Sequence, residues 1–118
     1  MDDKILARLE IVAGYANRIT QTINRAGSYD GFLADYDLQY SVAHSISQIA
    51  ETLNNAMHAD PQLADQILHT IPYRDIKRMR DKIQHHYGSI DPDIVWSIAT
   101  LNIPELKKEI EALIDSST

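Results

Sequence analysis

KILARLEIVAGYANRITQTINRA, residues 4–26, is the stretch that sets the fold class of this chain of 118 residues. Its apolar residues recur at alternating intervals of four and three, which places them along one narrow side of a long helix. Such a narrow stripe suits an antiparallel bundle, or packing against a second copy of the chain. We expect Asp2 or Asp3 to cap this helix and Gly27 with Ser28 to end it. The stripe consists of Ile5, Leu9, Val12, Ala16, Ile19, Ile23 and Ala26.

A second helical stripe follows a short connecting segment. Residues 28–37 mix aromatic side chains with acids and glycine, which predicts a short helical turn or an ordered loop. Apolar residues then recur at helical spacing over residues 38–59, so we expect a second long helix there. Its inner face carries Leu38, Val42, Ile46, Ile49, Leu53 and Met57, and its other side carries Gln39, His44, Gln48, Glu51 and Asn55.

Proline and glycine divide the rest of the chain into shorter helices. Asp60–Pro61 and Asp91–Pro92 each combine a capping aspartate with a proline at the first helical position. Gly88 is expected to end the helix between them, and Asn102 and Pro104 to interrupt the chain before a last helix. The helices expected in this part cover residues 62–68, 73–87, 93–101 and 105–115.

The whole pattern predicts an all-α protein. No stretch has the alternating, β-branched pattern of a strand, and neither a linker nor an internal repeat divides the chain. A chain of 118 residues has the length of one domain with a modest core. We therefore expect a single domain over residues 1–118, an up-down bundle of about five helices.

Composition excludes several classes of protein and of site. The chain has no cysteine, which rules out disulfides, thiol nucleophiles and cysteine-based zinc sites. His44, His58 and His69 lack the spacing of metal ligands, so we expect no metal site. The sequence shows neither a signal-peptide pattern nor a run apolar enough to cross a membrane, so we expect a cytoplasmic protein. The net charge is −6, and nucleic acid binding would therefore need a local basic patch.

The helix expected over residues 73–87 contains such a patch. Five Lys and Arg residues stand there against two acids, a local charge of +3. Winding the segment at about 100° per residue gives an apolar stripe, which must face the core, and a polar stripe opposite to it. The apolar stripe is Ile76, Met79 and Ile83; the polar stripe is Arg74, Arg78, Asp81 and His85; Arg80, Gln84 and Tyr87 lie along the border.

Two spacings on this helix bear on chemistry. Asp81 and His85 are four residues apart, close enough for the carboxylate to orient the imidazole and support its charged form. Arg80 and His85 are about 140° apart on a straight helix, so they would flank a groove rather than touch, especially if a second subunit closes the site. A basic outer helix face is also often only solvated surface. The pattern alone leaves both interpretations open.

The same segment resembles the R-x4-H-x-Y motif of the HepT-like toxins, a branch of the HEPN superfamily. Arg80, His85 and Tyr87 stand at the positions of that motif. Similar stretches lie at residues 49–52 (IAET), 71–76 (IPYRDI), 88–96 (GSIDPDIVW) and 103–106 (IPEL). The likeness therefore covers nearly the whole chain.

The resemblance implies a HEPN-like, all-helical homodimer in which two motif helices meet in a cleft. It implies the toxin of a type II-like toxin–antitoxin system, a metal-independent endoribonuclease without a cofactor. It also implies an RNA substrate and, as partner, an MntA-type nucleotidyltransferase antitoxin that adenylylates Tyr87. The assigned residues are Arg80 and His85 as catalytic groups, Asp81 and Gln84 as orienting groups, and Arg74, Lys77 and Arg78 as contacts to the RNA backbone.

The residue types suit this chemistry. Cleaving RNA without a metal needs a base for the ribose 2′-hydroxyl, an acid for the leaving 5′-oxygen and a cation for the phosphorane. His85 can serve as base or acid because histidine titrates near neutral pH, and Arg80 can hold two phosphate oxygens at once. A dimer would supply a second copy of both. AMP on Tyr87 would block the cleft by its charge and its bulk.

Two departures from the family pattern keep a second function open. Asp81 stands where the family commonly has Asn, and His86 where it has a small or polar residue. An extra carboxylate beside the phosphate site should weaken RNA binding. The alternative is a non-catalytic helical subunit that binds a nucleotide or a nucleotidyltransferase.

Overall fold

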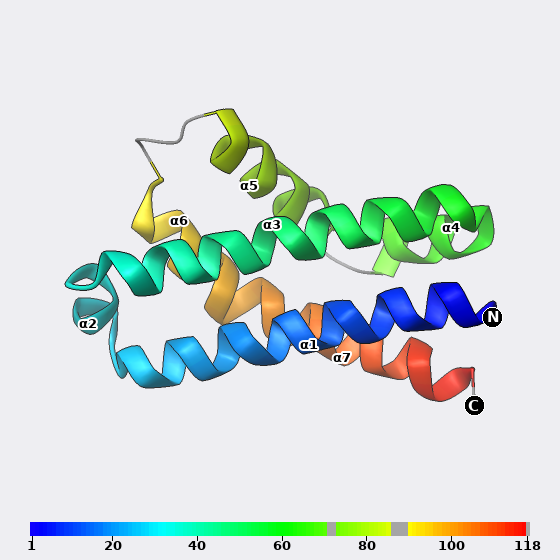
Figure 1. Cartoon of the computed structure of the whole chain (residues 1–118), viewed down its shortest axis with the longest axis horizontal. Coiled ribbons are helices and arrows are strands. Elements are labelled where there is room, and N and C mark those ends of the chain that lie inside the picture. The colour runs from blue at the N-terminus through cyan, green and yellow to red at the C-terminus, as the bar shows by residue number, and fades with distance from the viewer. Residues whose placement is uncertain (71–72, 86–89, 118) are drawn as a thin grey trace.

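The structure is a computed structural model that describes residues 1–70, 73–85 and 90–117, and of residues 69–70 and 83–85 it describes the backbone alone. Two long helices form its centre, α1 (Asp3–Ala26) and α3 (Tyr36–Ala59). They run side by side in opposite directions, and the short α2 (Tyr29–Leu33) lies at the turn between them (Figure 1). The centre of the fold is thus the antiparallel pair that the narrow stripe of residues 4–26 predicts.

The ends and the buried face of α1 confirm the prediction. Asp2 is the cap, and its carboxylate accepts the backbone N–H of Lys4 at 2.7 Å. Gly27 ends the helix with a left-handed φ of 77°, which glycine adopts without a steric penalty. Its N–H donates to the carbonyl of Ile23 at 3.2 Å. The stripe faces the core, with Ile5, Leu9, Val12, Ala16 and Ile19 buried and Ile23 and Ala26 half-buried.

α3 differs from the prediction at its first turn. It begins at Tyr36, because the Asp35 carboxylate accepts the backbone N–H groups of Asp37 and Leu38 at 3.0 and 3.3 Å. The placement of Gln39 on the outer side is wrong, since its side chain is only 6% exposed. Its Nε2 donates to two carbonyls of α2, Phe32 at 2.9 Å and Leu33 at 3.2 Å. Gln39 is buried because α2 folds over the start of α3.

Two shorter helices, α4 (Pro61–Thr70) and α5 (Tyr73–His85), cover one side of α3. Asp60 caps α4 as predicted, and its carboxylate accepts the N–H groups of Gln62 and Leu63 at 3.1 and 3.2 Å. α5 lies against α3 on the side away from α1 (Figure 1). The expected end of this helix at Gly88 lies outside the described residues. α5 is therefore an outer helix with one face on the bundle.

The last part of the chain is one continuous helical run. It consists of α6 (Pro92–Ser97), a π-helical segment η1 (Ile98–Asn102) and α7 (Ile103–Ser116). The expected interruption at Asn102 and Pro104 is wrong. The N–H of Ile103 donates to the carbonyl of Ile98, five residues back, and Pro104 then occupies the first turn of α7, where a missing N–H costs little.

These helices enclose one continuous hydrophobic core. α1 packs against α3 and α7, and the described residues contain no strand, which confirms the all-α fold class. Of the described helices, α1, α3, α4, α5 and α7 have ten residues or more. Trp96 is half-buried, with its ring 5.2 Å from Phe32 and 5.6 Å from Tyr29, so that α6 is held against α2. The molecule is elongated, 42 × 28 × 21 Å, with both termini at the same end (Figure 1).

Candidate functional site

α5 presents its apolar side to the bundle and its cations to the outside. Tyr73, Ile76 and Met79 are buried against the core, which confirms the predicted apolar stripe up to Met79. The side chain of Ile83 lies outside the described part of the chain. The exposed cations of this helix are Arg74, Lys77, Arg78 and Lys82. Arg74, Lys77 and Arg78, which we expect to contact the RNA backbone, are therefore all at the surface.

The surface position of these cations matters because charge is unevenly distributed along the chain. Residues 26–73, which include α2, α3 and α4, contain six acidic residues and neither lysine nor arginine. α5 then carries five cations and two acids within thirteen residues. The positive charge that could attract a polyanion to this side of the bundle therefore lies on α5.

Arg80 occupies the border position that the helical winding predicts. Its side chain is only 23% exposed, and its Nη1 lies 3.8 Å from Oδ1 of Asp81, which is 51% exposed. The Nε atom of Arg80 is buried and has no hydrogen-bond partner. A buried guanidinium N–H without an acceptor is costly, so the fold keeps Arg80 in this position at some expense of stability.

The Tyr73 hydroxyl lies near enough to Arg80 for its pKa to respond to the charge of the guanidinium. Burial raises the pKa of the Tyr73 hydroxyl, the Arg80 guanidinium opposes that rise, and the Asp81 carboxylate adds to it. The three groups therefore form one electrostatic cluster along the flank of α5. The spacing of seven residues between Tyr73 and Arg80, two helical turns, was the signal in the sequence that could have indicated it.

The structure describes the other motif residues only in part. The backbone of α5 is helical through His85, so the expected angle of about 140° between Arg80 and residue 85 applies to this helix. The structure describes neither the side chains of Gln84 and His85 nor any part of Tyr87. The pairing of Asp81 with His85 and the roles of Gln84 and Tyr87 stay predictions.

A groove of about 390 Å³ opens on the other flank of α5, facing α6 and η1. The Nδ2 of Asn102 donates to Oδ2 of Asp75 at 3.5 Å and ties η1 to α5 there. The groove could not be predicted from the sequence, because its walls come from segments about twenty residues apart whose contact has no local signal. Its lining residues are Asp75, Arg78, Met79, Lys82, Asp93, Ile94, Ser97, Ile98 and Asn102.

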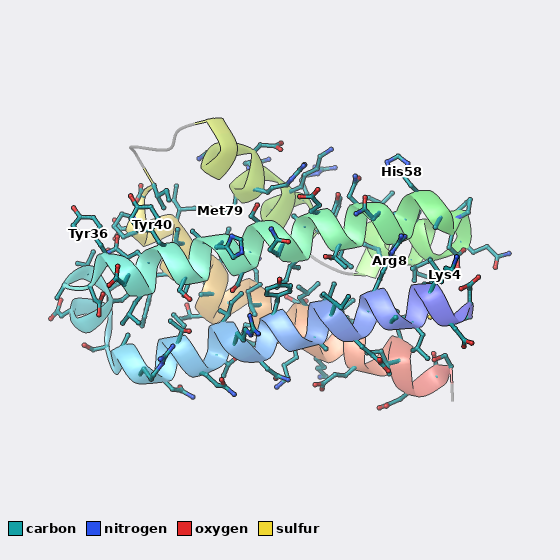
Figure 2. All side chains as sticks on the ribbon, in the orientation of Figure 1. Lys4, Arg8, Tyr36, Tyr40, His58 and Met79 are labelled. Carbon is teal, nitrogen blue, oxygen red and sulfur yellow. The ribbon has the colours of Figure 1, made fainter. Side chains whose placement is uncertain are left out.

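A second exposed surface lies at the far end of α3. Tyr36 and Tyr40 are 73% and 50% exposed, with ring centroids 6.5 Å apart, and both project outward near the α2 end of the molecule (Figure 2). Acids accompany them, since Asp35 and Asp37 flank Tyr36. The acids oppose phosphate, so this surface is a poor continuation of the basic face of α5.

Among the side chains that the structure describes, which exclude those of residues 69–70 and 83–85, no group of three or more His, Asp or Glu could hold a metal ion. Over residues 1–70, 73–85 and 90–117, no helix combines the length and the apolar character needed to span a membrane.

Known proteins that are similar to this chain point to one family. The family model described as "Ribonuclease HepT-like" matches residues 9–113. The "Putative RNase MJ0127" of Methanocaldococcus jannaschii is 30% identical over 110 residues, 93% of this chain and 81% of that protein. The "Probable ribonuclease HepT" of Thermococcus cleftensis is 30% identical over 98 residues, 83% of this chain and 86% of that protein. No solved structure matches the chain.

Proposed function

Because the chain belongs to the HepT-like ribonuclease family, we propose that it is a metal-independent endoribonuclease and the toxin of a type II-like toxin–antitoxin system. The observation that carries this proposal is the position of the motif on α5. Arg80 and position 85 of the motif lie on the helix that exposes four cations, and residues 26–73, which precede these cations in the chain, contain neither lysine nor arginine. A basic surface around a base, an acid and a guanidinium is what metal-free RNA cleavage requires.

The proposed reaction is an internal transesterification. One His85 takes the proton of the ribose 2′-hydroxyl, whose oxygen attacks the adjacent phosphorus. The bond from phosphorus to the 5′-oxygen breaks, and a second His85 gives that oxygen its proton, which leaves a 2′,3′-cyclic phosphate and a 5′-hydroxyl. Arg80 holds the charge that grows on the phosphorane oxygens, because a guanidinium can bind two phosphate oxygens at once.

A homodimer is part of the proposal, because positions 80 and 85 lie on different sides of one helix. With about 140° between Arg80 and His85, one α5 cannot bring both onto the same phosphate. Two copies of α5 facing across a cleft supply Arg80 of one protomer beside His85 of the other. Asp81 and Gln84 orient these groups, and Arg74, Lys77 and Arg78 hold the RNA backbone on either side.

The proposed partner is a nucleotidyltransferase antitoxin that acts on Tyr87. It transfers AMP from ATP to the phenol oxygen, a P–O bond forms at the α-phosphorus, and pyrophosphate leaves. The added anion lies at the C-terminal side of α5 and competes with the RNA phosphates for the same cations. We place this pair in the cytoplasm and regard residues 1–118 as one domain.

Cleavage assays with substituted proteins test the catalytic assignment. Purified wild type should cleave single-stranded RNA in the presence of a chelator, and His85→Ala should reduce kcat by about 100-fold or more, the usual worth of a general acid or base. Arg80→Ala should reduce it comparably. His58→Ala is the matched control, because it removes an exposed histidine at the C-terminal end of α3 (Figure 2). Equal rates for His85→Ala and wild type would sink the assignment.

One observation favours a second function, a non-catalytic subunit that binds a nucleotide or the nucleotidyltransferase. The Asp81 carboxylate lies 3.8 Å from the Arg80 guanidinium and offsets part of the charge meant for phosphate. Expression of this chain alone in a bacterial host distinguishes the two functions. Growth arrest that needs His85 supports the ribonuclease. Normal growth, with a nucleotidyltransferase gene beside this one, supports the binding subunit.

A further inference from the structure

The groove between α5, α6 and η1 has the layout of a small-molecule site. Its floor is apolar, formed by Met79, Ile94 and Ile98, of which Met79 and Ile98 are buried. Polar side chains surround that floor on both walls. A volume of about 390 Å³ falls within the range of roughly 300–1,000 Å³ that such sites occupy. An apolar floor with a polar margin suits a flat, ring-shaped group that has hydrogen-bonding edges.

The α5 wall supplies positive charge. Arg78 and Lys82 are four residues apart, so they lie one above the other on the groove side of the helix. Both side chains are exposed, and within the described chain neither pairs with a carboxylate. Two cations one turn apart, neither of them in an ion pair, form an attractive site for a phosphate group.

The opposite wall supplies hydrogen-bond acceptors. Asp93 and Ser97 project from α6, one turn apart, and both are exposed. Asp75 lies at the other end, where it already accepts the amide of Asn102. Asp93 therefore remains as the carboxylate best placed to accept a hydrogen bond from an amino group on a ligand.

We propose that this groove binds one nucleotide of the RNA substrate, with its base on the apolar floor and its phosphate on Arg78 and Lys82. Asp93 then accepts a hydrogen bond from an exocyclic amine, which cytosine, adenine and guanine carry and uracil lacks. The inference rests on the proposed function, since it names a subsite for that substrate. It also separates Arg78, which lines the groove, from Arg74 and Lys77, which lie outside it.

The position of the groove suits a nucleotide next to the scissile bond. Residue 85 follows Arg78 by seven residues, about two turns, so its backbone position lies on the same stripe of α5. Arg80 lies on the other flank, about 160° from Arg78 around the helix axis. An RNA strand that leaves the cleft along the exposed side of α5 thus passes Arg78 and Lys82. A base bound in the groove there would determine which phosphate of the RNA lies in the cleft.

Titration of the full-length protein with mononucleotides tests the subsite without requiring cleavage. The proposal expects CMP to bind the ¹⁵N-labelled wild type, with the amide shifts concentrated at residues 93–98. UMP should bind about fivefold more weakly, for the loss of one hydrogen bond. Lys82→Ala should weaken CMP binding by about tenfold, the worth of one charge-assisted contact. Ser97→Trp should abolish it by filling the groove.

Two control variants mark effects that are not specific to the groove. Asn17→Trp adds the same bulk to an exposed position on α1, and Lys108→Ala removes an exposed cation from α7. Both should bind CMP as the wild type does. If Ser97→Trp does not fold, Lys82→Ala and the difference between CMP and UMP still decide the question.

The outcomes separate this inference from the proposed function. Absence of saturable CMP binding, or binding that Lys82→Ala and Ser97→Trp leave unchanged, overturns the subsite even where His85-dependent cleavage is present. Equal affinity for CMP and UMP overturns the role of Asp93. Groove-dependent CMP binding without any His85-dependent cleavage upholds the subsite and rejects the ribonuclease.

Discussion

Tyr73 and Arg80 lie on the same flank of α5, where burial raises the pKa of the Tyr73 hydroxyl and the Arg80 guanidinium opposes that rise. The arginine proposed for phosphate binding is only 23% exposed on this flank. Side chains restricted by burial lose less entropy when a ligand binds. The titration of Tyr73 offers a way to detect the burial of this flank.

Tyr73→Phe should change the dependence of stability on alkaline pH. The folded-state pKa of Tyr73 is raised above its ordinary value of 10.0, so its neutral form contributes stability that is fully present below about pH 10. That contribution is lost as the pH rises through the higher, folded-state pKa. Denaturant unfolding between about pH 9 and pH 12 should therefore show a steeper loss for wild type than for Tyr73→Phe.

Tyr36→Phe is the control for this measurement, because Tyr36 is 73% exposed on α3. Its pH dependence should follow the wild type throughout. The same steep loss in Tyr73→Phe as in wild type would show that some other group carries the effect, and would contradict a raised pKa of Tyr73.

Arg74 and Lys77 should govern the salt dependence of RNA binding. Each phosphate contact to single-stranded RNA contributes about 0.7 to the slope of log K against log salt concentration, because it releases a counterion. In a His85→Ala background, which prevents cleavage, Arg74→Ala with Lys77→Ala should lower that slope by about 1.4. Fluorescence anisotropy at several salt concentrations measures it. Lys4→Ala, at the opposite end of the molecule from α5 (Figure 2), should leave the slope unchanged.

Gln39→Leu should destabilise the fold by about 2 kcal/mol, since it removes two hydrogen bonds from a buried side chain to carbonyls of α2 and leaves the Phe32 carbonyl with only the longer bond from the Asp35 N–H at 3.3 Å. Chemical denaturation measures the difference. Gln21→Leu, an exposed change on α1, should stay within about 0.5 kcal/mol of wild type. A similar small effect for both variants would contradict the structural role of Gln39.

Two glycine substitutions in α1 should have opposite effects. Gly27→Ala places a Cβ at a φ of 77° and should cost about 1 kcal/mol. Gly14→Ala lies within the helix, where an added Cβ meets nothing within 4 Å, and should stabilise by roughly 0.5–1 kcal/mol. Thermal unfolding should thus move in opposite directions for the two variants, by about 4 °C per kcal/mol.

Co-expression with the cognate nucleotidyltransferase should increase the intact mass by the mass of one or more AMP groups. Tyr87→Phe should show no increase, because the acceptor oxygen is absent. Tyr40→Phe, an exposed tyrosine on α3, should be modified as the wild type is. An unchanged mass increase in Tyr87→Phe would place the modification on another residue.

The local features of the fold could be predicted, because each depends on a few neighbouring residues. The caps at Asp2, Asp60 and Asp91 and the end at Gly27 are examples, as is the buried stripe of α1. Gln39 could not be placed, because its burial depends on α2 folding back over it. The π-helical segment could not be predicted either, because Asn102 and Pro104 are as typical of a break between two helices as of a π-helical turn.

For the site, the sequence identified the helix but not its surroundings. The border position of Arg80 followed from helical winding, and the motif itself from family resemblance. The groove beyond Arg78 depends on how α5 rests on η1. Contacts of that kind join segments that are distant in the chain, and no spacing within α5 records them.

The π-helical turn at Ile98–Asn102 also bears on how sequences of this family should be aligned. A π-turn is an α-helix with one residue inserted, and the insertion is absorbed locally. A homologue one residue shorter here could keep both Trp96 and Ile103 in the core, with an uninterrupted α-helix between them. A single gap at this place would then mark a change in the groove wall around Asn102, while the helices on both sides stay equivalent.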